Sequence, residues 1–277
     1  MTGALSLAHS PGPHDTFVFH AWSAGLVPRA PDVEVTLADI DVTNSLAERG
    51  ELDVLRVSYA ALPRVWDRYT LLPCGGVLGH GCGPLLLTAA HREPAELAGR
   101  VVAVPTERST AHLLFRLWAR RVLPGVEVDT VVMPFDRIMP AVRDGEVDAG
   151  LVLHEARFTY RRYGLFPMVD LGQEWEDRTG MPVPLGAIVA RRSLGQRRLD
   201  EVAEAIRASV RYAWANPWVS AEYVRAHAQE MSPEVRQRHI ELYVNSSTEE
   251  LGESGHQAVR ALLGHLVDGD AATDPWW

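Results

Sequence analysis

Short apolar segments of strand length alternate with segments of helical periodicity through the first two thirds of the chain. Apolar and polar residues alternate in a half-buried strand, whereas an amphipathic helix repeats its apolar positions every three or four residues. These patterns predict strands over residues 5–8, 33–40, 51–59, 100–105, 126–134, 146–153 and 187–192. They predict helices between them over residues 16–22, 42–50, 110–123 and 137–144. Strands that alternate with helices favour an α/β fold.

The last third of the chain differs, because helical periodicity continues there without strands. Helices are predicted over residues 200–216, 217–230, 232–245 and 253–269, and residues 271–277 are predicted to be a tail. Ser232 before Pro233 is typical of a helix start. Asp15 is predicted to cap the first helix, and Gly50 to end the second.

A weak internal repeat suggests two similar lobes. The segments that begin at Pro11 and Pro105, 94 residues apart, both read Pro, four residues, Thr and then a helix. Gly50 and Gly145, 95 residues apart, both end a helix before a strand. We therefore expect a discontinuous first α/β lobe of residues 1–88 and 190–277, which includes the C-terminal helices, and a second lobe of residues 89–189. Two hinged lobes of this kind favour a ligand cleft between them.

Candidate site residues follow from this plan, because α/β sheets bind ligands beyond the carboxyl ends of their strands. Four segments fall at such positions, namely residues 10–16, 56–59, 109–111 and 154–157. His154 is the leading candidate, since an apolar strand delivers it and imidazole can accept a proton near neutral pH. A structural histidine that bonds a neighbouring loop is the alternative. The other ten histidines, His9, His14, His112 and His239 among them, are expected at the surface or in packing.

The remaining candidates also have two interpretations each. Ser109 and Thr110 open a helix, where they cap it or present its N–H groups to a carboxylate. Ser58 can donate a hydrogen bond or simply end its strand. Arg56 faces solvent, or its fork-shaped guanidinium holds a carboxylate. The basic run at Arg157, Arg161 and Arg162 is expected to be a solvated face.

Composition narrows the function. The net charge of −9 argues against nucleic-acid binding. No apolar run approaches the roughly 20 residues that span a bilayer, and the amino terminus lacks a secretory pattern. A cytoplasmic protein with two free thiols, Cys74 and Cys82, is therefore expected. The sequence has no phosphate-binding glycine loop, dinucleotide fingerprint, zinc helix or nucleophile elbow, which leaves proton transfer or plain binding of a small carboxylate.

Several ordered motifs resemble the 1,4-dihydroxy-6-naphthoate synthase family of futalosine-type menaquinone biosynthesis. Residues 10–17, SPGPHDTF, resemble its S-P-C-P-N-D-T-F signature, and Val57-Ser58-Tyr59-Ala60 resembles its L-S-Y-A. Residues 75–85 are similar to its glycine-rich G-G-x-L-G-x-G-x-G-P-L stretch. Residues 104–111 are similar to its V-P…T-T-A helix start, residues 145–160 to its G-E-V…H-E-S-R-F-T-Y block, and residues 182–188 to its L-P-L-P-L-G-A-I.

The resemblance implies a two-lobed periplasmic-binding-protein-like fold used by a cytoplasmic, cofactor-free lyase. The implied reaction converts cyclic dehypoxanthinyl futalosine to 1,4-dihydroxy-6-naphthoate and a three-carbon fragment, with His154 as the general base. The substrate would be bound by Thr16, Arg56, Val57, Ser58, Ser109, Thr110 and Ala111.

This chain departs from the family pattern at three positions. Gly12 and His14 stand where the family usually has Cys and Asn, and Arg56 stands where Lys is common. The alternatives are a chorismate dehydratase of the same pathway and a solute-binding protein without catalysis.

Overall fold

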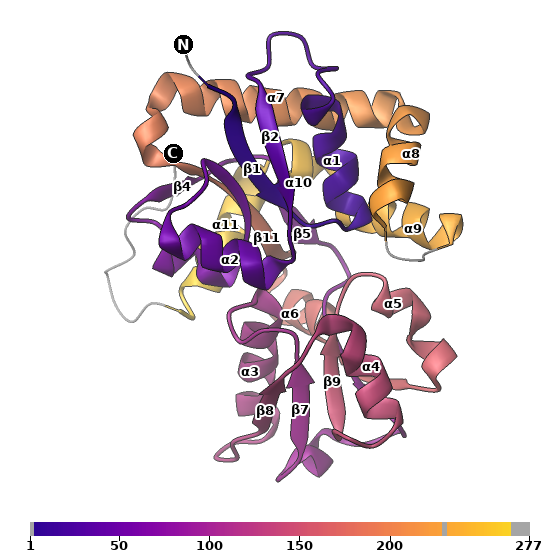
Figure 1. Ribbon diagram of the computed structural model, residues 1–277. Coiled ribbons are helices and arrows are strands. Elements are labelled where there is room, and N and C mark those ends of the chain that lie inside the picture. Colours follow the sequence, from indigo (N-terminus) through magenta and orange to yellow (C-terminus); the bar gives the residue numbers. More distant parts are fainter. Residues whose placement is uncertain (1–2, 229–231, 267–277) are drawn as a thin grey trace. The chain divides into compact units, whose positions relative to one another are not determined.

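The computed structural model describes residues 3–228 and 232–266, so the predicted tail at residues 271–277 lies outside the described residues. The chain divides into two compact units. Unit 1 comprises residues 1–78 and 184–277, and unit 2 comprises residues 79–183. The division is discontinuous, and it assigns residues 79–88 to the second unit. Each unit is built on one mixed β-sheet (Figure 1).

Unit 1 begins with alternating strands and helices, as the sequence predicts. These elements are β1 (Leu5–His9), α1 (Pro13–Ser23), β2 (Val33–Leu37), α2 (Ile40–Arg49) and β3 (Val54–Ser58). The sheet order is β2-β1-β3-β11-β4, in which β1 is parallel to β2 and β3. β11 (Val183–Arg191) runs antiparallel to β3 and to β4 (Tyr69–Leu71), and it also pairs with β5 (Val77–Gly79).

The C-terminal part of unit 1 is helical, as its periodicity predicts. It contains α7 (Gln196–Ala215), α8 (Pro217–His227), α9 (Pro233–Tyr243), α10 (Ser246–Glu249) and α11 (Gly252–Leu263). The Ser232 hydroxyl caps α9 by accepting from the N–H of Val235 at 3.3 Å, which confirms the predicted start. α1 packs against α7, α8 and α9, and no described helix is long and apolar enough to cross a membrane.

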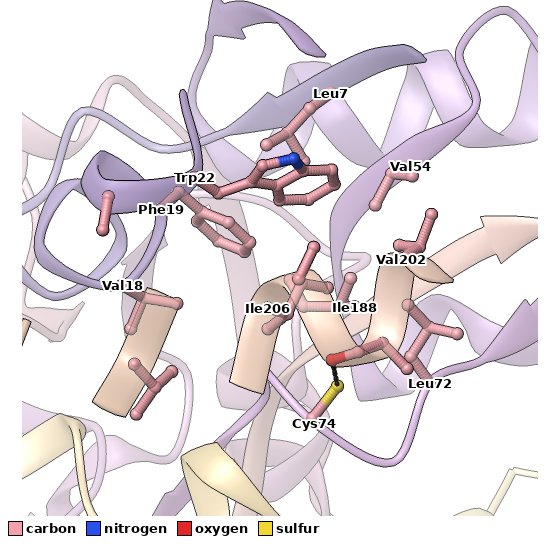
Figure 2. Close-up of a cluster of buried hydrophobic side chains, with 14 of the residues drawn as sticks. Leu7, Val18, Phe19, Trp22, Val54, Leu72, Cys74, Ile188, Val202 and Ile206 are labelled. Atoms are coloured by element: carbon pink, nitrogen blue, oxygen red, sulfur yellow. Dashed lines mark hydrogen bonds between the residues drawn. The ribbon is translucent and has the colours of Figure 1, made fainter. Parts of the chain in front are cut away.

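A large apolar cluster joins the sheet of unit 1 to these helices (Figure 2). Phe19 and Trp22 of α1 meet Leu7 of β1 and Ile206 of α7 in this cluster, all at most 2% exposed. Burial of an aliphatic or aromatic side chain contributes about 1.5–3 kcal/mol. The cluster therefore anchors α1 firmly, and with it the polar residues at the start of that helix.

Unit 2 repeats the strand–helix order of unit 1. It contains β7 (Val101–Val104), α3 (Thr110–Val122), β8 (Asp129–Val132), α4 (Phe135–Arg143) and β9 (Ala149–Val152). The sheet order is β10-β6-β9-β7-β8, in which β10 comprises Phe166–Asp170 and β6 comprises Leu85–Thr88. β7 is parallel to β8 and β9, and β6 is antiparallel to β9. An apolar cluster that includes Leu87, Ile138 and Val142 lies between this sheet and α4.

Some local predictions were wrong or missing. The first helix begins at Pro13 rather than Thr16, and its N-cap is Gly12. Asp15 therefore lies inside the first turn and does not cap the helix. The short strands β4, β5, β6 and β10 (Phe166–Asp170), together with α6 (Leu171–Thr179), were not predicted, because segments this short carry little periodicity.

Candidate functional site

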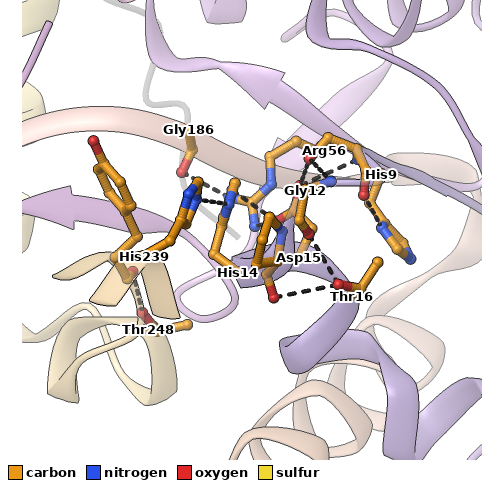
Figure 3. A network of polar contacts seen from close by, with 12 residues as sticks. His9, Gly12, His14, Asp15, Thr16, Arg56, Gly186, His239 and Thr248 are labelled. Atoms are coloured by element: carbon orange, nitrogen blue, oxygen red, sulfur yellow. Dashed lines mark hydrogen bonds and ion pairs between the residues drawn. The ribbon is translucent and has the colours of Figure 1, made fainter. Parts of the chain in front are cut away.

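Unit 1 carries a buried polar network at the carboxyl edge of its sheet (Figure 3). Because β1 and β3 are parallel, the loop after His9 and the end of β3 meet at the same edge. Asp15, in the first turn of α1, is fully buried and forms an ion pair with Arg56 of β3. Its other carboxylate oxygen accepts from the N–H of Ser10 at 3.1 Å and from the Ser10 hydroxyl at 2.8 Å.

The electrostatics of this network favour a charged Asp15. Burial alone would raise the pKa of the Asp15 carboxyl, but Arg56 and His14 outweigh it and hold the pKa well below its usual range. Nε2 of His14 lies 3.3 Å from the Asp15 carboxylate, and Nδ1 of His14 lies 3.0 Å from Nε2 of His239. A guanidinium, a carboxylate and two imidazoles are thus connected in one buried network.

Arg56 is 3% exposed, so the solvent-facing interpretation was wrong. Its guanidinium donates to Asp15 and to the carbonyl of Gly186, at 3.2 Å for the latter. Its Nε–H has no hydrogen-bond partner among the described residues. An unsatisfied buried donor costs about 1–3 kcal/mol, so this Nε–H is a candidate donor to a ligand oxygen.

The other predicted residues of unit 1 contribute in different ways. The Ser58 hydroxyl accepts from the side chain of Asn44 at 3.3 Å, which leaves its own hydrogen to donate. Val57 is fully buried between Arg56 and Ser58 and pairs with Ala187 of β11. The Thr16 hydroxyl donates within its own helix, to the carbonyls of Gly12 at 3.0 Å and Pro13 at 3.3 Å.

Unit 2 places the remaining predicted residues at the carboxyl edge of its own sheet. β7 leads to the start of α3, and the parallel strand β9 ends at Val152, two residues before His154. Ser109 is the N-cap of α3, and its hydroxyl accepts from the N–H of His112 at 3.1 Å. Thr110 and Ala111 follow in the first turn, which contains no acidic residue. The positive end of the α3 dipole therefore meets no carboxylate from its own turn.

His154 has a left-handed backbone, with φ of 53°. A non-glycine residue in this region costs roughly 1–2 kcal/mol, because its Cβ crowds the backbone. The ring meets Phe135 edge-on, with centroids 6.0 Å apart. Such strain persists where the surrounding structure enforces it, and it concentrates at functional sites.

The basic run beyond β9 is only partly a solvated face. Arg161 and Arg162 are exposed as predicted, but Arg157 bonds the carbonyl of Gly83 at 3.0 Å and pairs with Asp170 at 2.5 Å. That ion pair lies in a pocket of about 380 Å³, which is lined by Leu85, Arg157, Tyr160, Pro167, Met168, Val169 and Asp170. Of the four segments predicted to lie at ligand-binding positions, only the one at residues 154–157 reaches this pocket, through Arg157. His154 and the predicted substrate-binding residues do not line it, so it is not the candidate site.

Asp15, His14 and His239 belong to the buried polar network of unit 1, but none of the three was singled out as a site residue from the sequence. Asp15 and His14 stand inside the SPGPHDTF motif, which offered a signal, whereas the sequence around His239 shows only helical periodicity. Cys74 and Cys82 are free, as expected, and both are buried. Within either unit taken by itself, the described residues bring together no three His, Cys, Asp or Glu side chains that could hold a metal ion.

Solved structures with the same architecture define the class. A crystal structure of an Archaeoglobus fulgidus protein is 34% identical, covers 95% of this chain and 96% of its own, and has a TM-score of 0.88. A Candida albicans protein described as having the generic periplasmic binding protein fold is 13% identical, with a TM-score of 0.70 and coverage of 97% and 92%. The chain thus has a periplasmic-binding-protein-like fold.

Sequence comparison places it more narrowly, since a family model described as menaquinone biosynthesis matches residues 5–268. The protein belongs to this menaquinone biosynthesis family. One relative, from Streptomyces coelicolor, is 62% identical over 94% of this chain and 91% of its own length. Another, from Thermus thermophilus, is 46% identical over 98% and 97%. Both relatives are named 1,4-dihydroxy-6-naphthoate synthase.

Proposed function

We propose that this protein is a 1,4-dihydroxy-6-naphthoate synthase, a carbon–carbon lyase of menaquinone biosynthesis. Its substrate is cyclic dehypoxanthinyl futalosine, and its products are 1,4-dihydroxy-6-naphthoate and a three-carbon fragment. The observation that carries the proposal is the 62% identity to a relative of that name over nearly the whole of both chains. The reaction needs no cofactor, and it takes place in the cytoplasm.

His154 is the general base in this proposal. Its position beyond β9 and its left-handed backbone support the role, because the strained conformation aims the imidazole in a way that an extended residue would not. A positioned base of this kind typically accelerates proton transfer by about 10²–10⁴-fold. The proton comes from an activated carbon of the substrate, and aromatisation of the product drives elimination forward.

The substrate carboxylate is held by the start of α3 in this proposal. Ser109, Thr110 and Ala111 form the helix start, where first-turn N–H groups and the dipole favour an anion. From unit 1, the Ser58 hydroxyl and the Nε–H of Arg56 donate to substrate oxygens. Thr16 and Val57 contribute packing near these donors. The predicted ligand cleft between the lobes stays a prediction.

The test compares His154→Asn with the unmodified protein, with chromatographic detection of the naphthoate product. We expect kcat to fall at least 100-fold for His154→Asn. The matched control is His91→Asn, which changes an exposed histidine of the same unit and should leave kcat within twofold. Turnover by His154→Asn within about tenfold of the unmodified protein would contradict the role of the base.

The same assay separates the alternatives. Consumption of chorismate in place of the cyclic substrate would identify a chorismate dehydratase. Tight retention of the cyclic substrate without product would identify a binding protein. Dialysis against a chelator should leave turnover unchanged, and loss of activity that added metal restores would contradict the cofactor-free proposal.

A further inference from the structure

His154 and Arg157 lie in one tight turn that follows β9. The N–H of Arg157 donates to the carbonyl of His154 at 3.2 Å, and α5 (Ala156–Thr159) begins inside this turn. Ala156 is 1% exposed and belongs to the apolar cluster of unit 2. The backbone of His154 therefore depends on how the next three residues are anchored.

The side chain of Arg157 anchors the far end of this turn. Its Nη1 donates to the carbonyl of Gly83 at 3.0 Å, and its Nη2 lies 2.5 Å from Oδ2 of Asp170. The two charged side chains are largely buried, at 18% and 21% exposed. A guanidinium that is held by two acceptors in different directions has little freedom to rotate. On the other side of His154, β9 is held by its pairing with β6 and β7.

The acceptors of Arg157 belong to a tightly packed part of unit 2. The second oxygen of Asp170 accepts from the N–H groups of Gly172 at 3.0 Å and Gln173 at 3.3 Å, so this carboxylate also caps α6. A Cβ at Gly83 would lie 2.5 Å from the Cα of Gly172, which means that the two backbones are in contact. The anchor cannot move far without disturbing the start of α6.

We infer that Arg157 is a positioning residue for the imidazole of His154. This role rests on the proposed function, in which His154 is the general base. The left-handed backbone of His154 is unfavourable for a residue with a Cβ, so the flanking segments must enforce it. β9 enforces it from the N-terminal side and Arg157 from the C-terminal side. Without Arg157 the turn relaxes, and the imidazole points in another direction.

Direct binding of the substrate by Arg157 is the competing interpretation. The Asp170 carboxylate already neutralises the guanidinium, so a substrate carboxylate would have to displace it. The two roles differ in their kinetics. Loss of a positioning residue lowers kcat at constant KM, whereas loss of a residue that binds the substrate raises KM.

The first test is Arg157→Ala. We expect kcat to fall about 5–30-fold, which corresponds to the cost of one left-handed residue, and KM to stay within twofold. The truncation enlarges the neighbouring pocket of about 380 Å³ beside Asp170. Guanidinium ions at concentrations well below denaturing should therefore restore part of kcat, whereas ammonium ions, which lack the planar fork, should not. A kcat within twofold of the unmodified protein, or a higher KM at constant kcat, would overturn the inference.

A milder variant and a double variant separate positioning from general stability. Asparagine caps helices about as well as aspartate, so Asp170→Asn should keep α6 intact while it weakens the hold on Arg157. We expect its kcat to fall about threefold, because a neutral hydrogen bond replaces a charge-assisted one. In a His154→Asn background, Arg157→Ala should change the residual turnover by less than twofold, because no base remains to be positioned. The full Arg157→Ala loss in that background would contradict a role through His154.

The matched control is Arg100→Ala. Arg100 pairs with Asp148 at 3.1 Å in the same unit, and this carboxylate likewise accepts a backbone N–H, that of Val101, at 3.1 Å. Asp148 immediately precedes β9, so the pair lies at the end of that strand opposite His154. We expect kcat of Arg100→Ala to stay within twofold and not to respond to guanidinium.

NMR of the histidine rings tests the inference without turnover. The signal of His154 is the one that disappears in His154→Asn. Arg157→Ala should shift this signal, guanidinium should move it back, and Arg100→Ala should leave it in place. An unshifted His154 signal in Arg157→Ala would overturn the positioning role. A complete lack of turnover by the unmodified protein would instead overturn the proposed function, whatever the position of this signal.

Discussion

The two units share one arrangement of strands and helices, which makes their differences informative. β1-α1-β2-α2-β3 corresponds to β7-α3-β8-α4-β9, and each sheet continues with an antiparallel strand, β11 or β6. Gly50 and Gly145, which suggested the repeat, both follow the second helix of their unit with positive φ, at 68° and 74°. The pairing of Leu7 with Val54 in unit 1 corresponds to that of Val102 with Ala149 in unit 2, each shifted by 95 residues.

The corresponding helix starts differ in charge. Arg56 of β3 corresponds to Leu151 of β9 at the same spacing. Asp15 of α1 corresponds to Ser109, the N-cap of α3, at the 94-residue spacing of the repeated motif. Unit 1 therefore carries a buried ion pair where unit 2 carries a cap and an aliphatic side chain.

The starts of the corresponding helices α1 and α3 therefore have different roles. In unit 1 the protein supplies its own carboxylate, Asp15, and the arginine that neutralises it. In unit 2 the start of α3 receives no acidic residue from its first turn, which suits a carboxylate that arrives with the substrate. A single fold element thus serves as an internal ion pair in one unit and as a proposed anion site in the other.

The largest predicted effect comes from making unit 1 resemble unit 2. Arg56→Leu leaves Asp15 buried without its partner, so the free energy of unfolding should fall by about 3–5 kcal/mol. Denaturant unfolding monitored by circular dichroism measures this change. The double variant Asp15→Ser with Arg56→Leu should recover most of the loss, because no charge remains buried. A double variant as unstable as the single one would show that the pair does not explain the loss.

Lowering the pH should destabilise the two units to different extents, and this effect should be smaller than that of Arg56→Leu. Burial lowers the pKa of His9 in unit 1 and of His112 in unit 2. Below about pH 6.5, the unfolded chain binds protons that the folded histidines resist, so both units lose stability as pH falls. Asp15 has a lowered pKa, so its contribution is present above about pH 3.8 and is lost as pH falls further.

Among the described residues, Asp15 of unit 1 is the one buried carboxylate whose pKa is strongly lowered. Unit 2 has no counterpart in its described part. Hydrogen exchange followed by mass spectrometry should therefore show similar opening of both units between pH 7 and 5, and earlier opening of unit 1 below pH 4. Opening of unit 2 first would contradict this reading of Asp15. The Asp15→Ser, Arg56→Leu double variant is the control, because it should remove the difference.

The strain at His154 predicts a still smaller effect on stability. Glycine adopts a left-handed backbone without crowding, so His154→Gly should be more stable than His154→Ala by about 1 kcal/mol. Thermal unfolding of the two variants measures the difference, and neither should turn over substrate appreciably. Equal melting temperatures would show that the left-handed conformation carries no cost.

The sequence predicted the repeated strand–helix order because periodicity is a local property. Gly50 as a helix end and Ser232 as a helix start were confirmed for the same reason, since capping depends on a few neighbouring residues. The short strand β6 was missed because its pairing with β9 and β10 comes from the tertiary structure. His154 was recognised as a candidate because a buried strand and its end can be read from one continuous segment.

The Asp15–Arg56 pair could not be predicted in this way. The two residues lie 41 positions apart, and the sequence alone suggests an ordinary role for each, a helix cap for Asp15 and a strand residue for Arg56. Only the parallel pairing of β1 with β3 brings them together. His239 joins them from 225 positions beyond His14, so the polar network that these residues form has no signature in the sequence pattern.

The smallest predicted effect concerns the reactivity of the two thiols, of which each unit contains one. Burial raises the pKa of Cys74 in unit 1 to about 12 and that of Cys82 in unit 2 to about 11. Only the thiolate reacts readily with disulfide reagents, so at pH 8 both cysteines should react slowly and at rates set by local opening. Mass spectrometry can follow each site separately. Because Asp15 and Arg56 lie in unit 1, Arg56→Leu should accelerate labelling of Cys74 more than that of Cys82, whereas equal acceleration would mean that the whole chain unfolds as one cooperative body.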